Sequence, residues 1–145
     1  MSPCQLFDMR RLVLDAGPLI ALLSSQDNYH KEAIKGFAQL PQEFGAVLTP
    51  LPILFEVYKF VAREQCPQVA QKALTIIKEE TTIVPLEMET MQTTFDLVIQ
   101  MTNWQGSLED ASVVVIAQKF NALIWTLDYR DLTWFKNIEL WTPST

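Results

Sequence analysis

The fold of this chain is best read from the stretch Arg11-Leu12-Val13-Leu14-Asp15-Ala16-Gly17-Pro18-Leu19-Ile20-Ala21-Leu22-Leu23. A strand-like apolar run ends at one carboxylate, and Gly-Pro then opens a second apolar run. This order is typical of a strand, a tight turn and a helix. Asp15 therefore falls at the C-terminal end of a strand. In an open α/β sheet, ligands and catalytic groups gather at that edge, because the loops there form a crevice beside helix N-termini.

A second stretch of the same shape lies near the other end of the chain. The run Ala122-Leu123-Ile124-Trp125-Thr126-Leu127-Asp128 is again an apolar strand that leads into a carboxylate. If the two strands are parallel neighbours, Asp15 and Asp128 face the same crevice.

Apolar periodicity and turn residues predict alternating helices and strands between these two stretches. The expected segments are a short helix through Leu23, a helix capped by Asp27 or Asn28 and ended by Pro41, a strand over 44–49, a helix over 53–63 after Pro50 and Pro52, a helix from Pro67, a strand over 81–85, a helix from about Glu87 with the apolar seam Met88, Met91, Phe95 and Val98, at most a short helix over 131–136, and a last strand over 138–141. This alternation predicts one α/β domain with a central, mostly parallel β-sheet and helices on both faces.

The segment from Ser107 to Phe120 is ambiguous in its local pattern. Four consecutive β-branched residues, 113–116, favour a strand. Ser107 followed by Asp110 resembles a capping box, which marks the start of a helix. We predict a helix, because of this cap, the length of the run and the need to connect two parallel strands.

Composition limits the classes of protein that this chain can belong to. At 145 residues it suits one domain, and its net charge of −6 arises from 11 basic and 17 acidic residues. The basic residues are scattered, which argues against tight binding of nucleic acid through a basic stripe. No apolar run approaches the roughly 20 residues that span a membrane, and the N-terminus does not resemble a signal peptide, so a cytoplasmic protein is expected. Cys4 and Cys66 are too few for a disulfide framework or a zinc site.

The only histidine, His30, limits the types of catalysis that are expected. Serine and cysteine hydrolase mechanisms would all depend on it, and zinc hydrolases are disfavoured. We interpret His30 as a residue on a helix surface. The four tryptophans are interpreted as core or interface residues. Among the aromatic residues, Trp134 and Phe135 have the least support for a place in the core.

Four carboxylates have unusual settings: Asp15 and Asp128 end strands, Glu56 lies in a mostly apolar helix, and Asp110 lies in the first turn of another helix. Several carboxylates in one crevice stay ionised only if a cation offsets their repulsion. Ligand sets made only of oxygen atoms suit Mg²⁺ or Mn²⁺. Such ions can activate water for attack on a phosphodiester.

These carboxylates and their neighbours resemble the PIN domain family, which includes the VapC-type toxins. The resemblance rests on four motifs in order, Leu14-Asp15-Ala16-Gly17-Pro18, Phe55-Glu56-Val57, Ser107-Leu108-Glu109-Asp110-Ala111-Ser112 and Thr126-Leu127-Asp128-Tyr129-Arg130-Asp131. It spans nearly the whole chain, with a domain core of about 11–142.

The resemblance implies a metal-dependent endoribonuclease that uses Mg²⁺ or Mn²⁺ and acts on RNA. It also implies a homodimer, for which exposed apolar residues on the first helices are candidates, and the toxin half of a pair restrained by a small antitoxin protein. By this match the metal-binding and catalytic residues are Asp15, Glu56, Asp110 and Asp128, with Glu109 and Asp131 as further candidates and Thr126 as a residue that orients a carboxylate or water. The family often has Ser or Thr directly after its first aspartate, where this chain has Ala16.

Each of these residues also has a structural explanation. Asp110 suits a capping box, Glu56 suits an ion pair with Lys59 on a solvated stripe, and Asp128 suits a turn. Two other functions therefore stay open. One is a non-catalytic PIN-like module that binds RNA or protein. The other is a phosphoryl-transfer enzyme of the haloacid dehalogenase kind, although Gly17 replaces the second aspartate of its usual Asp-x-Asp pair.

Overall fold

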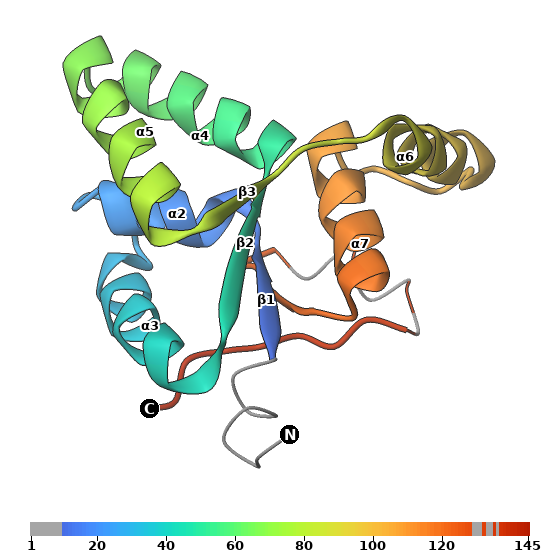
Figure 1. Cartoon of the computed structure of the whole chain (residues 1–145). Coiled ribbons are helices and arrows are strands. Elements are labelled where there is room, and N and C mark those ends of the chain that lie inside the picture. The colour runs from blue at the N-terminus through green and yellow to red at the C-terminus, as the bar shows by residue number, and fades with distance from the viewer. Residues whose placement is uncertain (1–9, 129–131, 133–134, 136) are drawn as a thin grey trace.

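The computed structural model describes residues 10–128, 132, 135 and 137–145, and Figure 1 gives the labels of its elements. Its helices and strands follow the order β1 (Arg11–Leu14), α2 (Ala16–Leu23), α3 (His30–Glu43), β2 (Ala46–Pro50), α4 (Leu51–Glu64), α5 (Pro67–Glu80), β3 (Thr82–Val84), α6 (Met88–Gln100), α7 (Leu108–Phe120) and β4 (Leu123–Trp125). The predicted alternation of strands and helices is thus confirmed.

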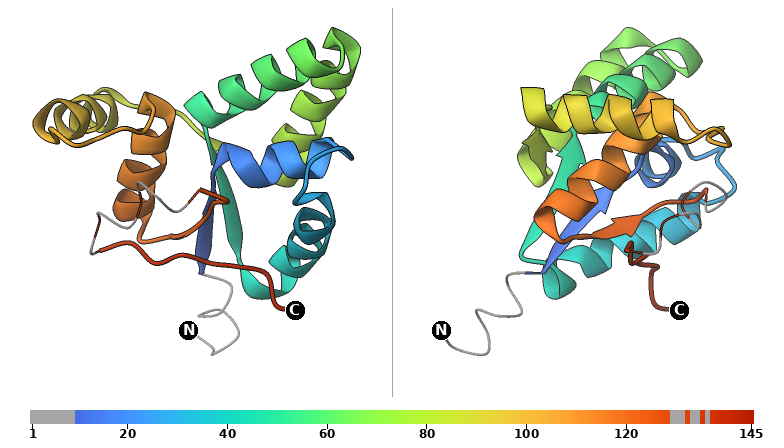
Figure 2. Two further views of the ribbon diagram at one scale, coloured as in Figure 1. Left: turned by 180° about the vertical axis from the view of Figure 1, so that it is seen from behind. Right: turned by 90° about the vertical axis from the view of Figure 1, so that its right-hand side faces the viewer.

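The four strands form one parallel sheet with the order β3-β2-β1-β4. In the register of the sheet, Leu12 pairs with Val47 of β2 and with Leu123 of β4. Figures 1 and 2 show α6 and α7 on one side of the sheet and α2, α3 and α5 on the other. The expected α/β fold with helices on both faces is confirmed.

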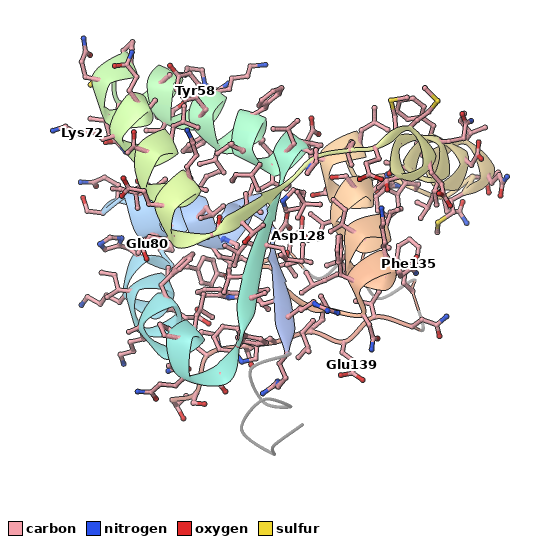
Figure 3. The ribbon with its side chains drawn as sticks, in the orientation of Figure 1. Tyr58, Lys72, Glu80, Asp128, Phe135 and Glu139 are labelled. Atoms are coloured by element: carbon pink, nitrogen blue, oxygen red, sulfur yellow. The ribbon has the colours of Figure 1, made fainter. Side chains whose placement is uncertain are left out.

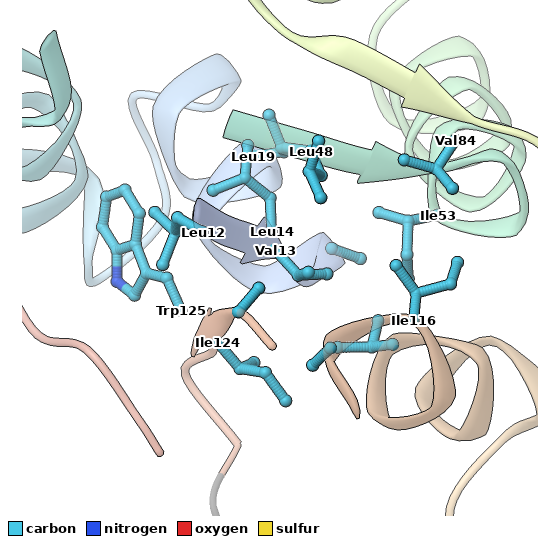
Figure 4. Close-up of a cluster of buried hydrophobic side chains, with 14 of the residues drawn as sticks. Leu12, Val13, Leu14, Leu19, Leu48, Ile53, Val84, Ile116, Ile124 and Trp125 are labelled. Carbon is cyan, nitrogen blue, oxygen red and sulfur yellow. The ribbon is translucent and has the colours of Figure 1, made fainter. Parts of the chain in front are cut away.

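The core is centred on β1, whose residues Leu12, Val13 and Leu14 are fully buried (Figure 4). Strands of a parallel sheet are covered on both faces, so their residues are apolar without alternation. Trp125 of β4 packs against Phe37 of α3, with ring centroids 4.8 Å apart. The core therefore joins the sheet to α3 as well as to α7.

The burial of helix α7 explains why its sequence pattern was ambiguous. Residues 111–117 are buried without interruption, because α7 lies against the sheet on one side and against α4 and α6 on others. A helix buried all round has no polar stripe to reveal its period. The capping box at its start, which identified it as a helix, is present in the structure.

Two expectations about α3 are wrong. Pro41 lies inside the helix, which continues to Glu43. The proline lacks an N–H to donate within the helix, but the helix is closed beyond it, because Phe44 N–H still donates to the carbonyl of Leu40 at 2.9 Å. The N-cap is Tyr29, while Asp27 accepts a hydrogen bond from the N–H of Tyr29 at 2.8 Å in the preceding turn.

The expected apolar seam of α6 is wrong at two of its four positions, Met88 and Phe95, whereas Met91 and Val98 are partly buried. Met88 is 79% exposed and Phe95 is 40% exposed, whereas Thr90 and Thr94 are buried. The Thr94 hydroxyl donates to the Thr90 carbonyl at 2.8 Å, and Lys119 of α7 donates to the Thr90 hydroxyl at 3.3 Å. Because these hydroxyls have partners, the threonine stripe can face α7 and leave apolar residues in solvent.

The C-terminal segment is less regular than predicted. Strand β4 ends at Trp125, so Leu127 lies outside it, and the strand expected over 138–141 is a single parallel bridge between Ile124 and Leu140. Trp141 is nevertheless buried, with its ring centroid 5.0 Å from that of Trp125. Most of the segment 131–136, and Cys4, lie outside the described residues. Within the described residues, no helix has the length and apolar character needed to cross a membrane.

We predict that Gly36→Ala destabilises the fold, although alanine is the better helix former. A Cβ on Gly36 would lie 2.3 Å from Cη2 of the buried Trp125, and such overpacking costs roughly 1–3 kcal/mol. Urea unfolding measures this cost. Lys35→Ala, on the exposed side of the same helix, is the control and should change stability by less than about 0.5 kcal/mol. Equal stability of the two variants would contradict the packing shown by the structure.

Candidate active site

The candidate site lies where the order of the sheet reverses. From β1 the chain continues to β2 and β3 on one side, and β4 adds to the other side of β1. Ligands of open parallel sheets bind beyond the strand ends at such a switch point. Asp15 directly follows β1, and Asp128 follows β4 after Thr126 and Leu127. Because β1 and β4 are parallel neighbours, the two carboxylates reach the same edge, as their strand contexts predicted.

Asp15 is the most buried of the four predicted site residues, with 9% of its surface exposed. Its Oδ1 accepts a hydrogen bond from the N–H of Ala16 at 2.8 Å, and its Oδ2 accepts one from the Thr126 hydroxyl at 2.7 Å. Burial raises the pKa of Asp15 to about 6, an effect that the Thr126 bond reduces and that Asp110 and Asp128 increase. The protein therefore holds this carboxylate in a position where its negative charge is unfavourable.

Glu56 extends from α4, which begins directly after β2 at the same edge of the sheet. Loss of solvent raises the pKa of Glu56 to about 7, and the nearby charges of Asp15, Asp110 and Glu109 act in the same direction. Its Oε2 is buried and has no hydrogen-bond partner among the described residues. The alternative of an ion pair with Lys59 is not supported, because the described part of the chain shows no such pair.

Asp110 lies in the first turn of α7 and forms the predicted capping box. Its Oδ2 accepts from the N–H of Ser107 at 3.2 Å, and its own N–H donates to the Ser107 hydroxyl at 3.1 Å. The structural explanation for Asp110 is therefore confirmed. It does not exclude a second role, since a carboxylate offers about four acceptor positions and a helix N-terminus favours negative charge.

Three of the four carboxylates line one small hollow between the sheet and α7. Its lining consists of Asp15, Asp110, Asp128, Val113 and Leu132. Figure 3 shows Asp128 between the strands and α7. The hollow measures about 10 Å³, which is room for one water-sized ligand. Glu56 does not line it, but lies close enough to Asp15 and Asp110 for their charges to raise its pKa.

The residues at this edge suit a hard divalent cation. All the donors are carboxylate oxygens, which Mg²⁺ and Mn²⁺ prefer, and the buried Oε2 of Glu56 lacks a partner within the described chain. A cation would also offset the repulsion that raises the pKa of Asp15 and Glu56. Among the described residues, no three acidic, histidine or cysteine side chains are already grouped as metal ligands.

Other residues that the sequence suggested have separate places. His30 lies at the start of α3, where its Nδ1 is 2.7 Å from the Ala21 carbonyl, away from the carboxylates. Trp125 and Trp141 are core residues as interpreted, while Trp104 stacks edge-on against Phe135 at 5.8 Å. Asp131 and Trp134 lie outside the described residues.

Sequence reasoning did not identify the apolar side of the hollow. Val113 and Leu132 line it beside the three aspartates. No local signal marks them. Val113 is one of seven consecutive buried residues, and Leu132 falls in the stretch for which the sequence predicts at most a short helix. A larger cavity of about 380 Å³ between α2, α3 and α5 is lined mostly by apolar residues, with Glu80 and Thr81 among them, and contains none of the predicted site residues.

We predict that Asp15→Asn stabilises the metal-free protein at high pH. A carboxyl group whose pKa rises on folding lowers the free energy of unfolding when it is ionised. This loss is absent below the unfolded pKa, near 3.8, and complete above the folded pKa of about 6. Removing the charge should raise the free energy of unfolding by about 2 kcal/mol at pH 8, and the gain should shrink toward pH 5. Thermal melts in the presence of EDTA measure the effect. Asp96→Asn, an exposed carboxylate on α6, should show no gain, and a lower melting temperature for Asp15→Asn at pH 8 would contradict the assigned cost.

Comparison with known proteins agrees with this architecture. The family model described as PIN domain matches residues 12–139. No curated protein matches the sequence. Among solved structures, VapC20 of Mycobacterium tuberculosis, a toxin that cleaves the sarcin-ricin loop, superposes with a TM-score of 0.76 at 16% identity, over 84% of this chain and 93% of that one.

Two toxin–antitoxin structures are similar in the same way. VapBC2 from Rickettsia felis, bound to a DNA fragment from its promoter, gives a TM-score of 0.73 at 13% identity, over 90% of this chain and 97% of that one. A toxin–antitoxin complex from Klebsiella pneumoniae gives 0.67 at 19% identity, over 92% and 98%. At these identities the structures establish a common fold, and the family model covers most of the sequence. The chain belongs to the PIN domain family.

Proposed function

We propose that this PIN domain protein is a metal-dependent endoribonuclease that hydrolyses RNA phosphodiester bonds. The observation that carries the proposal is the convergence of Asp15, Asp110 and Asp128 on one hollow. Glu56 adds a fourth carboxylate, whose buried Oε2 has no partner in the described chain. The similarity to VapC20, itself a toxin that cleaves the sarcin-ricin loop, also supports it.

In this proposal the four carboxylates Asp15, Glu56, Asp110 and Asp128 hold Mg²⁺ or Mn²⁺, directly or through water. A bound ion of this type activates water for in-line attack on phosphorus and stabilises the charge on the leaving oxygen. To bind such an ion, the four carboxylates must be in their ionised form. An acidic protein of net charge −6 can then hold a phosphodiester without a basic stripe.

We further propose that the protein is the toxin of a toxin–antitoxin pair and acts in the cytoplasm. The structural neighbours include several toxin–antitoxin complexes, which supports a small antitoxin as its partner. Co-expression with the product of an adjacent small reading frame tests this. A stable complex in which RNA cleavage is lost would support the assignment.

The second candidate function is a non-catalytic PIN-like module that binds RNA or protein. The net charge of −6 and the absence of a hydroxyl at Ala16 favour it, as does the lack of a preformed metal-ligand group in the described residues. A ligand selective for the folded state must raise its melting temperature. The two candidates therefore differ in whether Mn²⁺ stabilises the fold.

We predict that Mn²⁺ raises the melting temperature of the wild-type protein and supports cleavage of a labelled single-stranded RNA of random sequence. At a Mn²⁺ concentration 100 times the Kd, the stabilisation should be about 2.7 kcal/mol. Glu56→Gln and Asp110→Asn should each weaken Mn²⁺ binding, measured by calorimetry, and lower cleavage more than about 100-fold, because they remove proposed ligands.

The matched control for these variants is Asp96→Asn on α6, which removes an exposed carboxylate and should leave binding and cleavage unchanged. Glu56→Gln is the cleaner of the two variants, because Asp110→Asn also alters the capping box. Full metal-dependent cleavage by Glu56→Gln would refute its role as a ligand. Absence of any Mn²⁺ effect on the wild-type melting temperature would favour the binding module.

We also predict a homodimer that uses α6. On this helix Met88 is 79% and Ile99 is 77% exposed, and their spacing places them with Phe95 on one side. Exposed apolar residues that form a contiguous surface are candidates for an interaction site. Light scattering should give a dimer for the wild type, a monomer for Ile99→Lys, and a dimer for Ile34→Lys, which alters an exposed apolar residue of α3. A wild-type monomer at millimolar concentration would exclude the dimer, and dissociation by Ile34→Lys alone would move the interface to the first helices.

A further inference from the structure

Phe55 is the most exposed aromatic residue that the structure describes. It lies on α4 directly before Glu56 and is 66% exposed. Trp125 and Trp141, in contrast, are buried in the core. The fold therefore uses little of the Phe55 ring for packing, although the ring adjoins a residue of the proposed metal site.

Helix α4 places Phe55 between an apolar groove and the carboxylates. Figures 1 and 2 show α4 with α5 on one side and α7 on the other, and α4 contacts both helices. On the α5 side, a groove of about 260 Å³ is lined by Leu54, Phe55, Tyr58 and Leu74. With 3.6 residues per turn, Glu56 and Tyr58 lie on opposite sides of Phe55 around the helix axis. The ring therefore forms the border between the groove and the proposed metal site.

A lysine lies one turn further along the same part of α4. Lys59 follows Phe55 by four residues and Glu56 by three, and these spacings make side chains neighbours on a helix. Lys59 is exposed, and within the described chain it forms no ion pair, whereas Arg63 is paired with Glu64 at 3.2 Å. The Lys59 ammonium can therefore contact an anion that approaches the carboxylates.

An aromatic ring and a cation at this spacing suit one nucleotide of a single strand. Exposed aromatic rings bind unpaired bases by stacking, whatever the identity of the base, and lysines contact the phosphates between them. The other charged groups at this edge are carboxylates, which repel a phosphodiester. Lys59 has the complementary charge. These charges favour a nucleic acid as the occupant over an apolar protein segment, which would need no cation here.

We propose that Phe55 and the adjoining groove form a subsite that stacks one unpaired base of the RNA substrate, while Lys59 contacts a neighbouring phosphate. This inference rests on the proposed function, because it places the subsite beside the proposed metal site. Phe55 binds substrate and holds no metal ion. Because a paired base cannot leave its stack without cost, the subsite favours unpaired RNA over a duplex.

Steady-state cleavage of a labelled single-stranded RNA of random sequence, in the presence of Mn²⁺, tests the subsite. Phe55→Ala should raise KM about 5- to 150-fold, the range of affinity that one base–aromatic stack contributes, with little change in kcat. Phe55→Trp keeps a ring and should stay within about 3-fold of the wild-type KM, whereas Phe55→Leu is apolar without a ring and should not. All three variants should melt near the wild-type temperature, because the replaced side chain is mostly exposed.

A second measurement reports stacking without cleavage. Short RNAs that carry the fluorescent base 2-aminopurine at successive positions are mixed rapidly with the Mn²⁺-loaded protein. At one position, the wild type and Phe55→Trp should change the fluorescence before any strand is cut, and Phe55→Ala should not. Calorimetry should give the same Mn²⁺ affinity for Phe55→Ala and the wild type, because the ring is not a ligand.

The matched control is Tyr29→Ala, which removes an exposed ring that lines neither the hollow nor the groove. It should leave KM unchanged. Lys59→Gln should lower the slope of log affinity against log salt by about 0.7, the value for one phosphate contact with a single strand. Lys35→Gln, on the exposed side of α3, should not change the slope.

The outcomes separate this inference from the proposed function. A wild-type KM and fluorescence change in Phe55→Ala would overturn the subsite and leave the proposed function intact, as would full activity in Phe55→Leu for stacking as its basis. Dissociation of a dimer by Phe55→Ala, with KM unchanged, would also overturn the subsite and assign the ring to a protein interface. Failure of the wild type to bind or cleave RNA would overturn both proposals.

Discussion

The parallel pairing of β1 with β2 on one side and with β4 on the other is the constraint on which the rest of the structure depends. It buries Leu12, Val13 and Leu14 completely and makes β1 the centre of the core. It also creates the switch point at which the ends of β1 and β4 lie side by side. Two carboxylates that are 113 positions apart in the chain (128 − 15) therefore reach the same hollow.

The helices that begin at this edge bring the other two carboxylates. Helix α4 starts at the end of β2, and α7 runs back along the sheet, so its N-terminus and capping box lie at the same edge. The result is a concentration of negative charge in a partly buried place. The raised pKa values of Asp15 and Glu56 reflect the free-energy cost of holding these two carboxylates in ionised form at this edge. The proposed cation would offset this repulsion.

The supporting contacts divide between local and distant parts of the chain. Asp110 is held by Ser107, three residues away, through a capping box that is visible in the sequence. Asp15 is held by Thr126, which comes from the opposite end of the chain. The first contact depends on helix geometry alone, while the second exists only because β1 and β4 are neighbours. The two aspartates of the same hollow therefore depend on different levels of structure.

The fold was largely predictable, because alternating apolar runs, prolines at helix starts and one capping box report local structure directly. The failures share a cause. The exposed Met88 and Phe95, the buried Thr90 and Thr94, and Pro41 inside α3 all depend on which neighbour a helix packs against or on the partners that its polar groups find.

The sequence by itself determined the elements, their order, and the position of each acidic residue at a strand end or in a helix, because periodicity and caps act over a few residues. The tertiary structure alone decided which carboxylates line a common hollow, that Glu56 lies beside them without lining it, and that Thr126 joins Asp15 to Asp128. These relations depend on strand order and helix packing, which bring distant residues together and which no local pattern encodes.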